Sequence, residues 1–330
     1  MTVKHTKAVI MGKFNDYLKS ITDVSLREEV REHAIIAGGS IASLLQGEEY
    51  NDLDIYFDSK SVLVEVVDYY TKYWNDNHNS TVTYIRDESS LQKYKERLIN
   101  QEVDDIMDSA DEDEEDITKE EAIEQANEQY DFLEYITIDE SGVYMFIRSS
   151  GIVEEKKMTE EQIEELQLPK YRPVFITDNA ISLADNIQII TRFSGEPDDI
   201  IKRFDYAHTT NYLVPSERKL ELNKKALSSL LTKELVYVGS EFPLCSIFRM
   251  RKFLDRGYTI NAGQILKMVF QLNQMDLTDI RVLRKQLIGV DSTYMVWFVS
   301  ELFNKTKGGK EEDLNDYVGQ IISKLFDEDI

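Results

Sequence analysis

The stretch that decides the fold is "AIIAGGSIASLLQGEEYNDLDIYFDS", residues 34–59. It opens with an apolar run typical of a buried strand, breaks at Gly38 and Gly39, continues as a short helical segment and returns to a strand at "DLDIYF". Asp52 and Asp54 stand two positions apart in that second strand, so a strand directs both to one side. Two ionised carboxylates in apolar surroundings need a cation or a proton nearby.

The length and composition indicate a globular protein with a sizeable core. The chain has 330 residues, of which 42% are hydrophobic, enough for two domains. No apolar run reaches about 18 residues, so we expect no membrane-spanning helix. The first twenty residues predict an amphipathic helix rather than a signal peptide. The single cysteine, Cys245, excludes an internal disulfide and is typical of a reducing cytoplasm, where we expect the protein to act.

The order of apolar periods predicts an α+β protein. Helical and strand patterns alternate from about residue 7 to residue 87, which predicts a small mixed sheet with helices around it. From residue 215 the 3.6-residue period dominates, including the stretches "DIRVLRKQLIG" and "STYMVWFVSELFNK". We therefore predict a sheet-containing domain over residues 1–214 and an all-helical domain over residues 215–330.

The negative charge is concentrated in one segment. The chain carries a net charge of −24, and residues 101–129 hold 14 acidic residues against one lysine. Such dense like charge repels itself and cannot be buried, so residues 99–129 are predicted to be an acidic insertion, a solvated loop or an outward-leaning helix. Long nucleic acids are disfavoured as partners because a phosphate backbone demands clustered positive charge.

The glycines and the two aspartates together predict a site for a metal-bound nucleotide. Gly38 and Gly39 allow a backbone to approach a phosphate closely, Ser40 adds a hydroxyl, and the following helix adds its positive N-terminal end. Asp52 and Asp54 can hold Mg²⁺, which prefers carboxylate and phosphate oxygens. The plainer alternative is a tight turn beside a solvated strand edge, although the apolar neighbours of Asp54 argue against it.

This pattern resembles the signature of the DNA polymerase beta-like nucleotidyltransferase superfamily. In that signature a glycine pair is followed, after about nine to thirteen residues, by Asp-x-Asp in an apolar strand. Here twelve residues, 40–51, separate Gly39 from Asp52. The resemblance implies transfer of a nucleotidyl group from an NTP with two Mg²⁺ ions, the triphosphate being held by Ser40 and the amides after Gly39.

The resemblance also implies a third carboxylate from a later strand. Asp205, in "RFDYAHTT", is our choice because it stands at the head of a strand-like segment. Asp178 and Asp185 are the alternatives, although both have the context of turn residues. A solvated acid at the end of a helix is the plainer interpretation of Asp205. His208 either orients Asp205 or packs in the interior.

The segment "FRMRKFLDRG" concentrates basic residues. Arg249, Lys252 and Arg256 share one face of a helix, and that face could clamp a triphosphate or an RNA end. An ordinary solvated stripe is an equal alternative. Four histidines without paired spacing give no case for zinc.

A second resemblance covers most of residues 34–57 and 172–295. Phrases such as "FITDNAISL" and "IQIITRFSGEPDDIIKRFDYAHT" are similar to a nucleotidyltransferase-like family of large tailed bacteriophages. This implies a phage protein acting in the host cytoplasm, and it names no acceptor. An RNA end, a protein or a small molecule could receive the nucleotide. The alternative from another class is a catalytically silent module that binds a host or phage protein.

Overall fold

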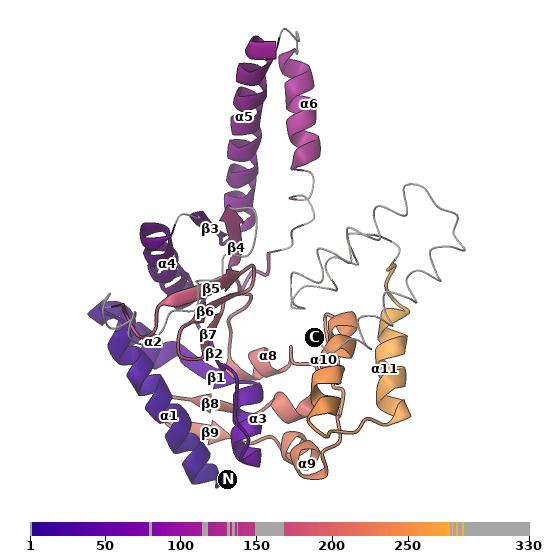
Figure 1. Ribbon diagram of the computed structural model, residues 1–330. Helices are drawn as coiled ribbons and strands as arrows, with labels where there is room; N and C mark the ends of the chain where they lie inside the picture. The colour runs from indigo at the N-terminus through magenta and orange to yellow at the C-terminus, as the bar shows by residue number, and fades with distance from the viewer. Residues whose placement is uncertain are drawn as a thin grey trace. The chain divides into compact units, whose positions relative to one another are not determined.

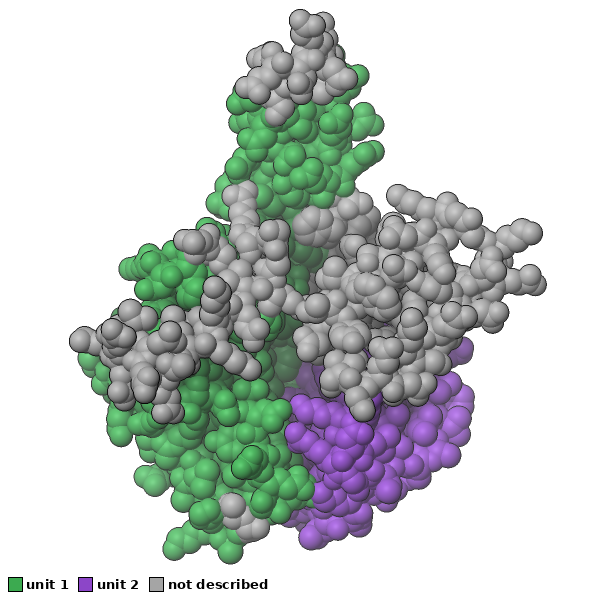
Figure 2. All heavy atoms as spheres, in the orientation of Figure 1, with its two compact units in different colours: residues 1–201, 211–221 green, residues 202–210, 222–330 purple. Residues whose placement is uncertain are grey.

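The computed structural model describes residues 2–78, 81–113, 118–130, 133, 136, 138–148, 168–277, 279, 282 and 286, without the side chains of 109–113, 147 and 148. The chain divides into two compact units, green and purple in Figure 2: residues 1–201 with 211–221, and residues 202–210 with 222–330. The helix predicted at 292–305 lies outside the described residues, as does most of the one predicted at 279–289.

The first unit is built on a mixed sheet whose described strands have the order β5-β6-β7-β2-β1-β8-β9 (Figure 1). β2 runs parallel to β7, and the other neighbouring pairs are antiparallel. The predicted α+β class with a mixed sheet is therefore confirmed. The strands are β1 (Ala34–Ala37), β2 (Leu53–Phe57), β5 (Pro173–Thr177), β6 (Ala180–Leu183), β7 (Ile187–Ile190), β8 (Tyr212–Val214) and β9 (Lys219–Glu221).

Four helices accompany the β1–β2 part of the chain and share one hydrophobic core with the sheet. Each begins where the sequence supplies a start signal: Thr2, Asp23 and Ser59 each accept a hydrogen bond from a backbone N–H of the following turn, and a glycine precedes the third helix. The core contains fully buried Phe14, Ile36 and Trp74. These helices are α1 (Val3–Ser20), α2 (Val24–His33), α3 (Gly39–Gln46) and α4 (Lys60–Asn77).

The acidic insertion forms two helices that run side by side, α5 (Glu88–Asp113) and α6 (Lys119–Gln129) (Figure 1). Buried Val103 packs against Ala122 and Ala126, whose spacing of four residues gives α6 one apolar stripe. The start of α5 packs on a separate two-stranded sheet, β3 (Thr81–Ile85) with β4 (Tyr144–Arg148). The insertion is thus helical, and its exposed faces carry the charge.

The second unit is mainly helical where it is described. It contains the short 3₁₀ helix η2 (Ala207–Thr209) and the helices α9 (Lys224–Thr232), α10 (Pro243–Asp255) and α11 (Ala262–Leu272). The helical pattern is predicted to begin at residue 215, but the first helix after that residue is α9. The residues just before it form β9, which pairs with β8 and extends the sheet of the first unit. In the first unit α8 (Pro197–Ile201) starts at Pro197.

No helix in the described part of the chain is long and apolar enough to span a bilayer.

Two glycines of the first unit are predicted to respond oppositely to alanine. A methyl group at Gly142 would lie 1.8 Å from the backbone oxygen of Arg192, whereas one at Gly12, inside α1, meets nothing within 4 Å. Gly142→Ala should lower the free energy of unfolding by about 2 kcal/mol, and Gly12→Ala should raise it by about 0.5–1 kcal/mol. Urea denaturation of the two variants measures both changes, and a stable Gly142→Ala protein would contradict the packing described.

Candidate active site

The turn between β1 and α3 requires its first glycine. Gly38 has φ of +100° and ψ of −155°, a conformation that side chains disfavour, and it stands directly before the first residue of α3. The first N–H groups of a helix have no intrahelical partner and carry partial positive charge. Gly47 ends the same helix in the left-handed conformation, which glycine adopts readily.

Asp54 lies against this turn. A methyl group built on Gly38 would stand 2.9 Å from Asp54 Oδ2, so the carboxylate occupies the space that any other residue would need for its side chain. Strand pairing fixes this placement: Leu53 and Ile55 are fully buried, and Asp54 between them is half-buried. The structure thus brings the glycine turn and the second aspartate of the motif together.

Asp52 stands just before β2 and is exposed. The Leu53 N–H donates to the carbonyl of Asn186 at 3.0 Å, which fixes the start of β2 beside β7. Strand alternation then places positions 52 and 54 on the same face, with fully buried Leu53 on the other. Two carboxylates therefore lie on one face at the edge where β2 begins.

Ser40 is buried, and its hydroxyl has no hydrogen-bond partner among the described residues. Gly39 is different, because a methyl group there meets nothing within 4 Å. The roles predicted for Gly39 and Ser40 in holding a triphosphate stay predictions.

Asp205 belongs to the second unit and is buried there. Arg249 Nη1 donates to Asp205 Oδ2 at 2.7 Å, and this pairing is what makes a buried carboxylate tolerable. The structure thus brings together two residues that the sequence assigned to metal binding and to triphosphate binding. Lys252 lies on α10 with Arg249, and Arg256 follows immediately as its C-cap. Their predicted roles at a nucleotide stay predictions.

The two alternative acids have partners of their own in the first unit. Asp178 Oδ2 accepts a hydrogen bond from the Tyr144 hydroxyl at 3.1 Å, and burial raises the pKa of Asp178. Asp185 lies 2.8 Å from Lys13 Nζ; burial opposes its ionisation, but its lysine and tyrosine neighbours together lower the pKa of Asp185. Among the described residues, no three His, Cys, Asp or Glu side chains gather as a metal site.

His208 packs in an aromatic cluster of the second unit. The centroid of its ring lies 4.3 Å from the ring centroid of Phe253 and 4.9 Å from that of Tyr258. Its Nδ1 has no hydrogen-bond partner in the described part of the chain. Burial lowers the pKa of His208 to about 4; the Asp205 carboxylate opposes that shift and Arg256 adds to it. The packing role is therefore the one that the contacts support.

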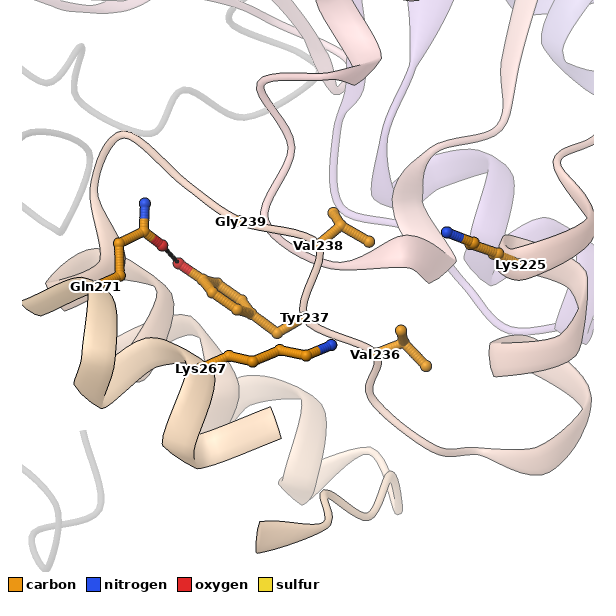
Figure 3. Close-up of a pocket in the computed structure, with 7 residues that line it drawn as sticks. All are labelled: Lys225, Val236, Tyr237, Val238, Gly239, Lys267 and Gln271. Atoms are coloured by element: carbon orange, nitrogen blue, oxygen red, sulfur yellow. Dashed lines mark hydrogen bonds between the residues drawn. The ribbon is translucent and has the colours of Figure 1, made fainter. Parts of the chain in front are cut away.

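Sequence reasoning missed a cavity in the second unit, which Figure 3 shows. Its lining residues are spread over 47 positions, and neither of its lysines belongs to the basic segment that the sequence singled out. The sequence feature that could have drawn attention to this segment is Gly239, which adopts a φ of +113° in the structure. The lining residues are Lys225, Val236, Tyr237, Val238, Gly239, Lys267 and Gln271.

A family model described as "Gabija anti-defense 2 family protein" matches residues 9–233. The chain belongs to this family. Residues 9–233 include the glycine turn, both motif aspartates and Asp205, whereas Arg249, Lys252 and Arg256 lie beyond the match. No curated protein matches this member of the Gabija anti-defense 2 family.

Two solved structures share distant similarity with this family member. "Structure of tRNA-processing enzyme with CTP" is 10% identical, with a TM-score of 0.34 over 76% of this chain and 46% of that one. "Thermotoga maritima CCA-adding enzyme complexed with tRNA_CCA" is 11% identical, with a TM-score of 0.36 over 92% of this chain and 55% of that one. The chain spans about half the length of these structures. A likeness this distant carries no statement about activity, which has to come from the residues described above.

Alanine at the two adjacent glycines tests the turn. Gly38→Ala should lower the free energy of unfolding by about 1–3 kcal/mol, because it adds strain at a positive φ and displaces the Asp54 carboxylate. Gly39→Ala, in open space at the first helical position, is the matched control and should stay close to the wild-type value. Urea denaturation measures both, and equal effects at the two positions would show that Asp54 does not lie against Gly38.

The buried histidine makes stability depend on pH in the acid range. The folded-state pKa of His208 is lowered to about 4 from 6.5, so the unfolded chain binds more protons between these values. Stability from this residue is complete above pH 6.5 and is lost as pH falls toward 4, by up to roughly 3 kcal/mol. His208→Phe, which keeps a ring and removes the titration, should lose that much less between pH 7 and pH 4 in chemical denaturation. Parallel losses in both proteins would contradict a buried neutral His208.

Proposed function

We propose that this protein transfers a nucleoside monophosphate from an NTP to an acceptor hydroxyl in a Mg²⁺-dependent reaction. The observation that carries the proposal is the placement of the Asp54 carboxylate against the Gly38 backbone, at the positive end of α3. The Asp54 carboxylate, a ligand for a cation, then lies beside the start of α3, whose backbone N–H groups suit a phosphate. A tight turn alone would require the glycine, but it would not require an acidic side chain beside that glycine.

The residues present fit a Mg²⁺ site. Mg²⁺ in proteins is commonly held by one or two carboxylates together with the oxygens of a bound phosphate, so the Asp52–Asp54 pair is a sufficient protein contribution. When bound, Mg²⁺ would supply positive charge to the triphosphate oxygens and to the attacking hydroxyl. A second ion and the part of Asp205 remain part of the proposal.

The chain's own groups would position the triphosphate. Gly38 allows the Asp54 carboxylate to lie against the backbone of the turn, and the N–H groups at the start of α3 offer donors without a charged side chain. These groups suit the phosphates of an NTP.

The family description directs the search for the acceptor. It names an anti-defense role against Gabija, and we propose that the nucleotide is transferred to a component of that system. The net charge of −24 makes a long nucleic acid a poor acceptor, so the proposed acceptor is a protein hydroxyl, a short RNA end or a small molecule.

Replacement of one motif aspartate tests the proposal. Asp54→Asn keeps the shape of the side chain and removes the charge, so transfer should fall by about a thousandfold or more, the rate equivalent of several kcal/mol of lost metal and phosphate stabilisation. The measurement is label transfer from each α-labelled NTP, with Mg²⁺, to Gabija components and to total RNA, resolved on one gel.

Asp58→Asn is the matched control. Asp58 directly follows β2 and is bound by His33 Nδ1 at 2.7 Å, so the substitution removes the same charge outside the proposed site and should leave transfer unchanged. Transfer by a folded Asp54→Asn protein would contradict the assignment.

A silent binding module is the second candidate. It is favoured by the acidic faces of α5 and α6, where Asp104, Asp105, Glu120 and Glu124 are exposed, and by a family description that names an antagonist. If Asp54→Asn keeps full activity against Gabija in cells while no variant transfers label, the module is the function.

A further inference from the structure

The second unit contains a cavity of about 390 Å³ between α9 and α11. Its floor is the extended segment at residues 236–239, and two helices border it (Figure 3). Lys225 comes from α9, and Lys267 and Gln271 come from α11. The volume is that of a small-molecule site rather than of a docking surface for a folded protein.

The two lysines direct their charge into this cavity. Figure 3 shows the ammonium ends of Lys225 and Lys267 turned toward the segment at 236–239 from opposite sides. Neither ammonium has a carboxylate within 4 Å among the described residues; Lys267 Nζ contacts the Gln264 side-chain oxygen at 3.2 Å. In a chain with 62 acids and 38 Lys and Arg residues, two lysines that face one cavity without an acid are available to an anion.

The polar groups of the floor are already engaged within the protein. The Tyr237 hydroxyl donates to Gln271 Oε1 at 2.6 Å, and Gln271 Nε2 donates to the carbonyl of Ser240. The Tyr237 N–H donates to Gln264 Oε1 at 3.0 Å. These bonds hold the floor in one conformation, so the lysines meet a ligand on a preformed surface that includes the apolar side chains of Val236 and Val238.

We propose that this cavity binds a nucleotide, with its phosphoryl groups held between Lys225 and Lys267. Two ammonium groups on opposite sides suit a ligand with several negative oxygens, and a phosphate chain offers more than one charge where a carboxylate offers one. The apolar floor at Val236 and Val238 suits the nucleoside. Gly239 carries no side chain and has open space around it, which leaves room beside the floor. The site consists of residues of the second unit and needs no metal ion.

Calorimetry on the full chain tests the proposal apart from the aspartate site. Asp52→Asn/Asp54→Asn protein in EDTA is titrated with ATP, pyrophosphate and inorganic phosphate at low and high salt. ATP should bind without metal, more tightly than pyrophosphate, and more weakly as salt rises. No binding of ATP would overturn the proposal, and equal affinities for ATP and pyrophosphate would overturn the part assigned to the nucleoside.

Three single substitutions locate the binding. Lys225→Gln and Lys267→Gln should each weaken ATP binding on the order of tenfold, since each removes one charge-assisted contact. Lys224→Gln is the matched control: Lys224 precedes Lys225 on α9 and is exposed, as Lys225 and Lys267 are, but it does not line the cavity, and its loss changes the net charge equally. Equal weakening by all three variants would show a general charge effect and overturn the site.

A covalent probe gives a readout that does not depend on affinity changes in variants. An acyl-phosphate derivative of ATP transfers its acyl group to a nearby lysine amine, forming an amide and releasing the nucleotide. Peptide mass spectrometry should find label at Lys225 or Lys267, removed by excess ATP, and none at Lys224. Labelling that ATP does not compete, or that favours Lys224, would overturn the proposal. Because the aspartates are replaced throughout, these outcomes stand whether or not the protein transfers nucleotides.

Discussion

The close approach of the Asp54 carboxylate to Gly38 depends on the register of the central strands. Ile36 of β1 pairs with Ile55 of β2, and Asp54 of β2 pairs with Gln188 of β7. A shift of one residue would turn Asp54 into the core and expose Leu53 and Ile55, which are fully buried. The hydrophobic pattern of the strand therefore fixes the position of a charged residue: burial of its two neighbours holds the carboxylate at the turn. The candidate site is in this sense a consequence of core packing, and the glycine is the residue that the packing leaves room for.

Local pattern made much of this fold predictable. The break between α1 and α2, the strand-turn-helix-strand order around the glycines and the end of α3 at Gly47 all follow from signals within about ten residues. The juxtaposition of Gly38 and Asp54 was predictable as well, because the two strands that carry them are neighbours along the chain. For the acidic insertion the sequence was compatible with either a loop or a helix, because its composition is dominated by charge. The small apolar stripe formed by the alanines at 122 and 126 is the feature that favours a helix.

What could not be predicted depends on contacts between distant parts of the chain. β3 pairs with β4 across some sixty residues that include the whole insertion, and no local signal names that partner. Asp205 and Arg249 are 44 positions apart, and their local contexts predicted separate roles, although a buried carboxylate needs a cation wherever the fold offers one. β9 is three residues long, too short for a strand period to stand out against the helical pattern that follows it. The cavity lined by Lys225 and Lys267 is formed by three segments that are separated in sequence. The sequence around each segment does not indicate that the three meet.

Net charge and local charge lead to different expectations for this protein. A net charge of −24 disfavours a long polyanion, because binding of a phosphate backbone depends on many clustered basic contacts. A single nucleotide samples only its immediate surroundings: at physiological salt, exposed charges more than about 8 Å away are largely screened. Under the proposals above, two lysines facing one cavity, or N–H groups at a helix start beside the Asp52–Asp54 pair, would therefore attract phosphate in a strongly acidic chain. Under the same proposals, the acidity would select ligands by size, favouring nucleotides and short ends over extended nucleic acids.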